Sequence, residues 1–113
     1  MSVVDEQAAF LLDATSLIRK ATEMGWTVTG GELYRTAEQQ EIYVKTGRSK
    51  TMNSNHLKRL AIDLNFFKNG ALIYDKAALQ AIGDFWESLH PRNSWGGNWS
   101  SFKDIPHFER RVP

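Results

Sequence analysis

The segment from Leu60 to Phe67 constrains the fold more than any other part of this 113-residue chain. Its residues are apolar almost throughout, which is typical of a buried strand, yet Asp63 and Asn65 interrupt it. A carboxylate in so apolar a setting costs free energy unless a cation or a metal ion pairs with it. We therefore expect a positive group beside Asp63, brought there by the rest of the chain.

The other segments predict helices packed on a small, mainly antiparallel sheet, so the expected fold class is α+β. Helical spacing of apolar residues, or a cap residue before helix-forming residues, predicts three helices, at residues 5–24, 37–45 and 75–89. Alternation and turn residues predict three further short strands, at residues 26–29, 71–74 and 105–110. Two stretches are expected to be loops: the polar segment 48–55 and the segment 90–101, which is rich in Trp and Gly.

Two details of these elements concern packing. On the first helix, the packing face is expected to consist of Ala9, Leu12, Leu17, Ile18, Ala21 and Met24. After the first strand, Gly30 and Gly31 indicate a bend or bulge at a point where another group comes close to the backbone. The helix is thus expected to be a packing element, and the two glycines a point of contact.

Composition limits what the chain can be. With 42% hydrophobic and 24% charged residues, residues 1–113 are expected to form one globular domain, with no room for a second. The net charge of +1 comes from 14 basic and 13 acidic residues mixed along the chain, so no nucleic-acid partner is expected. The first residues resemble neither a secretory signal nor a membrane span. We therefore expect a monomer without a membrane partner, which stays in the cytoplasm unless something releases it.

The absence of cysteine means that any metal site must be built from histidine and carboxylate side chains. His56, Asp63 and His107 form a two-histidine, one-carboxylate set that suits one zinc ion. Three protein ligands leave the fourth position of zinc for water, as in catalytic rather than structural sites. Asp104 could act as a base, and Arg35 could stabilise an oxyanion or hold a substrate carboxylate.

Each of these five residues also has an ordinary structural interpretation. The histidines could be a surface residue and a core residue, and the aspartates could cap backbone groups or a turn. Arg35 could be an ion-pair partner of Glu32 or Glu38. The third histidine, His90, suits a helix cap before Pro91 and is left out of the metal site. A Ser-His-Asp hydrolase is excluded because the chain has no Gly-x-Ser-x-Gly motif.

Four motifs occur in order along most of the chain, from about residue 30 to residue 109. They are Tyr34-Arg35-Thr36-x-x-x-Gln40, Ser54-x-His56-x(4)-Ala61-x-Asp63, Trp95-Gly96-Gly97-x-Trp99 and Asp104-x-x-His107-Phe108-Glu109. Together they resemble the LAS zinc peptidases, a family that includes D-alanyl-D-alanine carboxypeptidases, dipeptidases of the vancomycin-resistance type and phage L-alanyl-D-glutamate endopeptidases. Four motifs in register are far more specific than any one of them.

The resemblance implies a role for each motif residue. The implied zinc ligands are His56, Asp63 and His107, with Asp104 as the catalytic base and Arg35 as the electrostatic stabiliser. Substrate contacts are expected at Gln40, Ser54, Trp95 and Trp99. Two positions depart from the family pattern. Arg59 stands where the family usually has glycine, and Asp104 stands where carboxypeptidase members more often have Glu, which favours the phage endopeptidase branch.

The implied activity is zinc-dependent hydrolysis of the bacterial peptidoglycan stem peptide, most specifically the bond between L-alanine and D-glutamate. The resemblance also implies a phage or prophage lysis enzyme that reaches the cell wall after a membrane pore opens, and no separate wall-binding domain is expected within 113 residues. Two alternatives stay open: a D-alanyl-D-alanine carboxypeptidase or dipeptidase, and a zinc-stabilised binding module without catalytic turnover.

Overall fold

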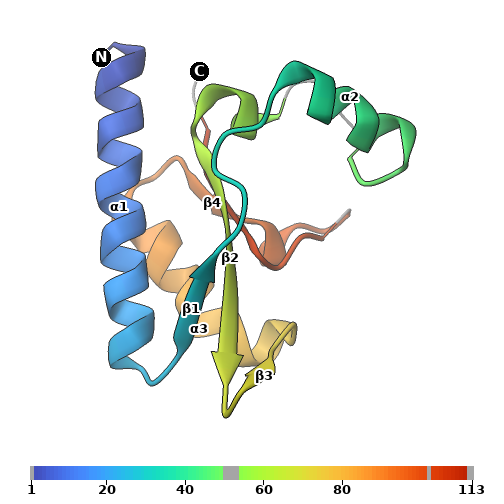
Figure 1. Ribbon diagram of the computed structural model, residues 1–113. Coiled ribbons are helices and arrows are strands. Elements are labelled where there is room, and N and C mark those ends of the chain that lie inside the picture. The colour runs from blue at the N-terminus through green and yellow to red at the C-terminus, as the bar shows by residue number, and fades with distance from the viewer. Residues whose placement is uncertain (1, 50–53, 102, 112–113) are drawn as a thin grey trace.

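The computed structural model describes residues 2–49, 54–101 and 103–111, and within them the chain is a mixed α+β domain with a small antiparallel sheet, as predicted (Figure 1). The α-helices are α1 (Val3–Glu23), α2 (Ala37–Lys45) and α3 (Lys76–Leu89). The strands are β1 (Thr27–Gly30), β2 (Ala61–Lys68), β3 (Ala71–Leu72), β4 (Asn93–Trp95) and β5 (His107–Arg110). The described ranges also contain two short 3₁₀ helices, η1 (Asn55–Lys58) and η2 (Gly96–Asn98).

The sheet is organised around β2, the strand whose sequence most constrains the fold. The strand order is β1-β2-β5-β4, every pairing is antiparallel, and β3 pairs with the end of β2. Asn69 and Gly70 turn the chain from β2 into β3, both with positive φ (52° and 78°), as a tight hairpin turn requires. In the pairing of β2 with β5, Asp63 lies opposite His107. This register brings together two residues that are far apart in the sequence.

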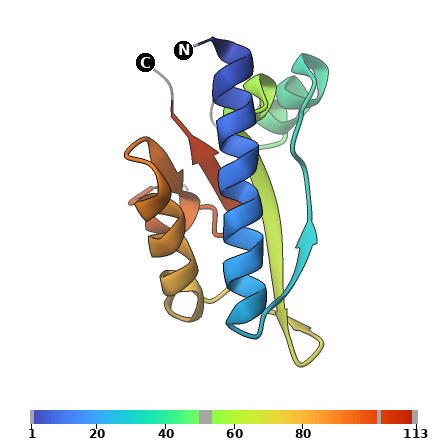
Figure 2. The ribbon, with the colours of Figure 1, turned by 90° about the vertical axis from the view of Figure 1, so that its left-hand side faces the viewer.

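The helices α1 and α3 pack against each other on one side of the sheet (Figure 2). The face of α1 that is buried consists of Glu6, Phe10, Ala14, Leu17 and Ala21. The predicted packing face was therefore partly wrong: Leu12 is 70% exposed, and Ile18 and Met24 are exposed as well. Apolar residues are adjacent in this helix, so the sequence offers two helical faces, and only packing against α3 and the sheet selects between them.

The segment 90–101, predicted to be a loop, contains strand β4 and the 3₁₀ helix η2. Its Trp95 is fully buried, stacks on Phe108 at a centroid distance of 6.4 Å, and donates a hydrogen bond to the carbonyl of Ile105. A methyl group at Gly83 or Gly97 would lie 2.0 Å or 2.3 Å from atoms of the indole ring. The Trp and Gly content of this segment thus reflects close packing of one indole between two glycines.

A buried group of charged and polar side chains joins α1 to β4 and β5. Arg110 is 2% exposed and donates hydrogen bonds to Asp13 and to Asn93. Arg92 forms an ion pair with Glu6, which is also 3.5 Å from Arg110. These contacts compensate the buried charges and fix the position of α1 along the sheet. None of the helices in the described ranges is long and apolar enough to cross a membrane.

Candidate metal centre

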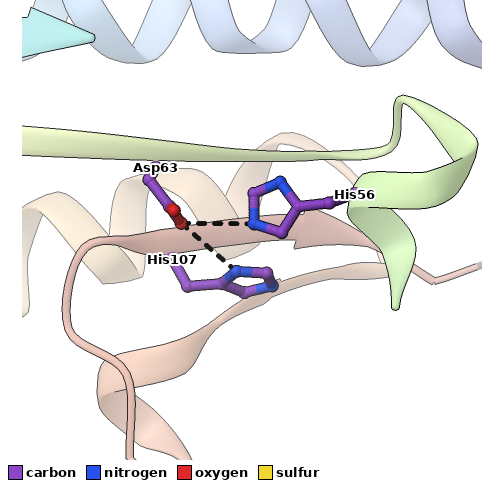
Figure 3. A group of neighbouring side chains, drawn as sticks. All are labelled: His56, Asp63 and His107. Atoms are coloured by element: carbon purple, nitrogen blue, oxygen red, sulfur yellow. Dashed lines mark ion pairs between the residues drawn. The ribbon is translucent and has the colours of Figure 1, made fainter. Parts of the chain in front are cut away.

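Three side chains meet where η1, β2 and β5 come together (Figure 3). His56 is contributed by η1, Asp63 by β2 and His107 by β5. The Oδ1 atom of Asp63 lies 3.4 Å from Nε2 of His56 and 3.4 Å from Nδ1 of His107. All three donor atoms lie within 4.8 Å of one another, and both histidines are buried. The structure therefore brings together the three predicted ligands.

Local backbone structure holds Asp63 and His56 in place. Ser54 caps η1, because its hydroxyl accepts a hydrogen bond from the backbone N–H of His56. Gly31 donates its backbone N–H to the carbonyl of Asp63 at 2.7 Å. A Cβ atom at Gly31 would lie 3.0 Å from Cβ of Asp63, so the predicted close approach at the two glycines occurs here.

Arg59 ends η1 in the left-handed conformation, with φ 57° and ψ 36°. That conformation favours glycine and costs other residues about 1 kcal/mol or more, which explains why the related motif usually has glycine at this position. In this chain the guanidinium of Arg59 lies 4.1 Å from the centroid of the Tyr34 ring. A cation–π contact of this kind contributes about 0.5–1 kcal/mol at an exposed site and offsets part of the strain. The turn after His56 is therefore kept without glycine.

The three donors fit a tetrahedral metal ion. Nε2 of His56 and Oδ1 of Asp63 are buried and have no hydrogen-bond partner among the described residues. Buried polar atoms are normally paired, so two such atoms that face each other indicate a position suited to binding a cation. Two donors bound at 2.0–2.1 Å to one tetrahedral ion lie roughly 3.3 Å apart, close to both measured distances. The geometry and the donor types thus agree with the predicted set.

Hydrogen bonds behind the histidines determine which ring nitrogen faces the ion. Nδ1 of His56 donates to the carbonyl of Leu33 at 3.1 Å, which leaves Nε2 as the free donor atom. Nε2 of His107 donates to Oε1 of Glu109 at 2.7 Å, which leaves Nδ1 free. Partners of this kind orient metal-bound imidazoles and raise their basicity. The two histidines therefore offer different nitrogens to the site.

Glu109 contacts the candidate ligand His107, and the sequence alone predicts no role for Glu109, although it belongs to one of the four motifs. It is 7% exposed, and its carboxylate accepts hydrogen bonds from His107 and from Arg111. The relevant signal was its spacing: residues two apart in a strand point to the same face, so a carboxylate two positions after a ligand histidine lies beside it.

The charges of this site shift one another's pKa values. Burial raises the pKa of Asp63, but the imidazoles of His107 and His56 beside its carboxylate outweigh burial and hold that pKa far below its usual range. Burial lowers the pKa of His107, but Asp63 and Glu109 outweigh burial and raise it to about 9. Without a metal ion, His107 is therefore protonated at neutral pH. The site provides enough negative charge to hold a cation in place of that proton.

Asp104 lies beside the three ligands in an open pocket of about 770 Å³. Its Oδ2 is 3.9 Å from Nδ1 of His107, and its side chain is 45% exposed. Burial raises its pKa, and the nearby negative charge of Asp63 adds to the shift, while the charge of His107 opposes it. A Cβ atom at Gly96 would lie 2.1 Å from the carbonyl oxygen of Asp104, so glycine is required for the backbone to approach here.

Arg35 also lines the pocket, and its side chain is 10% exposed. It forms two hydrogen bonds to the carboxylate of Glu32, each 3.3 Å long, and a third of 2.7 Å to Oε1 of Gln40. Its guanidinium also lies 4.6 Å from the centroid of the Tyr43 ring. Arg35 thus forms the ion pair with Glu32 that was its ordinary alternative interpretation, and it also lines the same pocket as the three candidate ligands.

The four expected substrate contacts separate into two groups. Ser54 and Trp99 line the pocket, and the Trp99 ring lies 5.1 Å from that of His107. The expectation of direct contact was wrong for Gln40 and Trp95, because both side chains are fully buried and neither lines the pocket. Gln40 instead holds Arg35, and Trp95 packs in the core. As expected, His90 caps α3 and lies outside the metal group.

Comparisons with known proteins identify a family of peptidases and several relatives. A family model described as D-alanyl-D-alanine carboxypeptidase matches residues 47–110. The chain is 33% identical over 102 residues to the L-alanyl-D-glutamate peptidase of Listeria phage A118, a match that covers 76% of this chain and 33% of that protein. It is 31% identical over 114 residues to the peptidoglycan L-alanyl-D-glutamate endopeptidase CwlK of Bacillus subtilis strain 168, covering 86% of this chain and 68% of CwlK. The chain thus spans one third of the phage protein and about two thirds of CwlK.

Among solved structures, the L-Ala-D-Glu endopeptidase ChiX of Serratia marcescens superposes with a TM-score of 0.68 at 26% identity. The superposition covers 84% of this chain and 75% of ChiX. The family match extends over more than half of the chain and includes all three candidate ligands and Asp104. The chain therefore belongs to the D-alanyl-D-alanine carboxypeptidase family of peptidases, the LAS peptidases that its motifs resemble.

Proposed function

We propose that this protein is a zinc-dependent peptidase that hydrolyses the L-alanyl-D-glutamate bond of the peptidoglycan stem peptide. The observation that carries the proposal is the arrangement of His56, Asp63 and His107 around a common point, with Asp104 beside them in an open pocket. The names of the phage, Bacillus and Serratia relatives support the choice of bond. We also propose that residues 1–113 form one catalytic domain, because one core supports both ligand segments.

Zinc is the proposed ion because of the donor set. Two imidazole nitrogens and one carboxylate oxygen make a site of intermediate softness, and the donor separations fit the short bonds of zinc. When bound, zinc would supply Lewis acidity, which polarises a peptide carbonyl and lowers the pKa of a water molecule toward about 7. His56, Asp63 and His107 would hold the ion, and Glu109 would hold His107.

Asp104 is the proposed general base. Its carboxylate faces the pocket next to the proposed ligand His107, with Oδ2 3.9 Å from Nδ1 of that residue, so it is placed to accept a proton from a water molecule in the pocket. It would accept the proton of the attacking water at a carboxylate oxygen and pass it to the nitrogen of the leaving amine. No covalent intermediate with a side chain is needed.

Arg35 is proposed to stabilise the negative charge that develops on the carbonyl oxygen. Three of its hydrogen bonds go to Glu32 and Gln40, which fix the guanidinium while it lines the pocket. A donor held in place before the reaction costs no reorganisation when the charge develops. Gln40 is then a positioning residue, because it touches Arg35 and lies outside the pocket.

A second candidate function is removal of the terminal D-alanine, as the description of the matching family suggests. A carboxypeptidase must bind the free carboxylate at the end of the stem peptide, whereas an endopeptidase cleaves within it. Asp104 in place of the longer glutamate favours the endopeptidase. The products formed from one intact stem peptide separate the two activities.

The test is digestion of purified peptidoglycan, with and without a chelator, followed by mass spectrometry of the new termini. We expect a new amino terminus on D-glutamate that disappears on chelation and returns when zinc is added. The Asp104→Asn variant should bind zinc and lose turnover, whereas His90→Ala, a histidine outside the site, should behave like the wild type. Release of free D-alanine would support the carboxypeptidase, and unchanged muropeptides from the zinc-loaded protein would overturn both.

A further inference from the structure

Three arginines line the pocket: Arg35, Arg48 and Arg111. Two of them have a carboxylate partner, because Arg35 pairs with Glu32 and Arg111 pairs with Glu109. Arg48 differs, since no carboxylate within residues 2–49, 54–101 and 103–111 lies within ion-pair distance of it. Its charge is therefore available to a ligand in the pocket.

The position of Arg48 is fixed at its backbone and supported at its side chain. The backbone N–H groups of Arg48 and Ser49 both donate to the carbonyl of Tyr43, at 2.8 Å and 3.1 Å. The guanidinium lies 5.6 Å from the centroid of the Tyr43 ring, whose hydroxyl donates to Glu32 at 2.8 Å. The ring thus supports Arg48 and, at 4.6 Å, Arg35. A guanidinium held against an aromatic ring keeps its N–H groups free to bind an anion.

The metal side of the pocket has the opposite charge. Asp63, Asp104 and Glu109 all line it, and Arg111 pairs with Glu109 while a bound zinc ion would offset the charges of Asp63 and Asp104. A substrate carboxylate near the bond to be cleaved therefore gains no net attraction from this group, and a further cation on the protein would be needed to bind it. Arg48 is the pocket cation that no described carboxylate already neutralises.

The identity of the anion that Arg48 would bind rests on the proposed function. A glutamate that continues a peptide through its side-chain carboxyl keeps its α-carboxyl free, and that group lies two bonds from the nitrogen of the L-alanyl-D-glutamate bond. The leaving side of the proposed substrate therefore carries an anion next to the reacting atoms. We propose that Arg48 binds this α-carboxylate, and that it makes the protein selective for stem peptides with D-glutamate over those in which the α-carboxyl is an amide.

The experiment compares two synthetic stem peptides that differ only in this group, one with the α-carboxylate and one with the α-carboxamide. A charge-assisted hydrogen bond contributes about 1.5–3 kcal/mol, so we expect kcat/KM of the wild type to be about 10- to 100-fold higher for the carboxylate. Arg48→Gln should lose this preference, mainly through KM for the carboxylate peptide, and keep its rate on the amide. Arg48→Lys should recover part of the preference, and Arg19→Gln, on the exposed surface of α1, should change neither rate.

The outcomes separate the possible sources of the effect. Equal wild-type rates on both peptides, or an equal loss on both in Arg48→Gln, would overturn the role of Arg48. A third peptide with an amidated C-terminus tests the terminal carboxylate. If the preference that depends on Arg48 followed this terminal group, Arg48 would bind the terminal carboxylate, and the proposal for the α-carboxylate would be overturned. Failure of the zinc-loaded wild type to cleave any of the peptides would overturn the proposed function itself, and this inference with it.

Discussion

Replacing Glu109 by glutamine tests how the site controls its affinity for metal. The carboxylate accepts a 2.7 Å hydrogen bond from Nε2 of His107, and both residues are buried. Glutamine keeps the size and an acceptor oxygen but removes the charge. Loss of such an outer carboxylate weakens metal binding about 10- to 100-fold, or roughly 1.4–2.8 kcal/mol. This loss should appear in full only where His107 carries no proton.

A second effect of the same change acts in the opposite direction. The pKa of about 9 for His107 means that zinc must displace a proton at neutral pH, which lowers the apparent affinity at pH 7 about 100-fold relative to a pH well above 9. Glu109 is one of the two carboxylates that raise this pKa. In Glu109→Gln the pKa should fall, so proton competition at pH 7 should decrease. The affinities of wild type and variant should therefore converge toward neutral pH and separate at alkaline pH.

Competition titrations with a chromophoric chelator at several pH values between 6 and 10 would measure both effects, with Glu38→Gln on the surface of α2 as the matched control. Wild-type affinity should rise steeply from pH 7 to pH 9, and the Glu109→Gln curve should be flatter and lie below it at the alkaline end. Parallel curves would show that Glu109 does not set the pKa of His107. Equal affinities above pH 9 would refute its role in supporting the ligand.

Three further changes have outcomes that follow from the structure. His56→Ala should abolish stoichiometric zinc binding and remove the stability that zinc confers, whereas His90→Ala should keep both; metal analysis and thermal unfolding with and without zinc check this. In metal-free protein the pKa of His107 is raised from 6.5 to about 9, so its stabilisation is complete below pH 6.5 and is lost as pH rises through 9. Urea unfolding should therefore show a loss on the order of 3 kcal/mol between these pH values, and an unchanged midpoint would contradict it. Gly83→Ala should destabilise the fold by about 1–3 kcal/mol because its methyl group would overlap Trp95, and a wild-type melting temperature would argue against this packing.

The sequence indicates that His56, Asp63 and His107 form one group because their chemistry is local and unusual. A carboxylate inside an apolar strand needs a partner, and few residue types other than histidine can supply one through a metal ion in a chain without cysteine. The helix after Thr36 was predicted for a similar reason, since the hydroxyl of Thr36 caps it as the sequence suggests. Predictions of this kind need only short-range information.

The incorrect predictions for Leu12, Trp95 and Gln40 depend on side-chain contacts that residue spacing alone does not specify. Leu12 and Phe10 are equally apolar, and only packing of α1 on α3 decides that Phe10 is buried. Trp95 belongs to the same motif as Trp99, yet Trp99 lines the pocket and Trp95 fills the core. Gln40 has a polar side chain on a short helix, and it is buried because it binds Arg35. In each case a tertiary neighbour decides the role of the residue.

Because Asp63 lies opposite His107 in the pairing of β2 with β5, binding of the proposed metal ion would depend on correct pairing of these two strands. The strands are far apart in the sequence, so their pairing closes a long loop and is expected to form late. A slip of one residue in this pairing would turn the ligands of one strand away from those of the other. Misregistered chains and chains still emerging from the ribosome without β5 would therefore offer at most two of the three ligands. Tight binding of the proposed zinc ion would thus select the molecules in which β5 has paired correctly with β2, and exchange of the ion would measure that pairing.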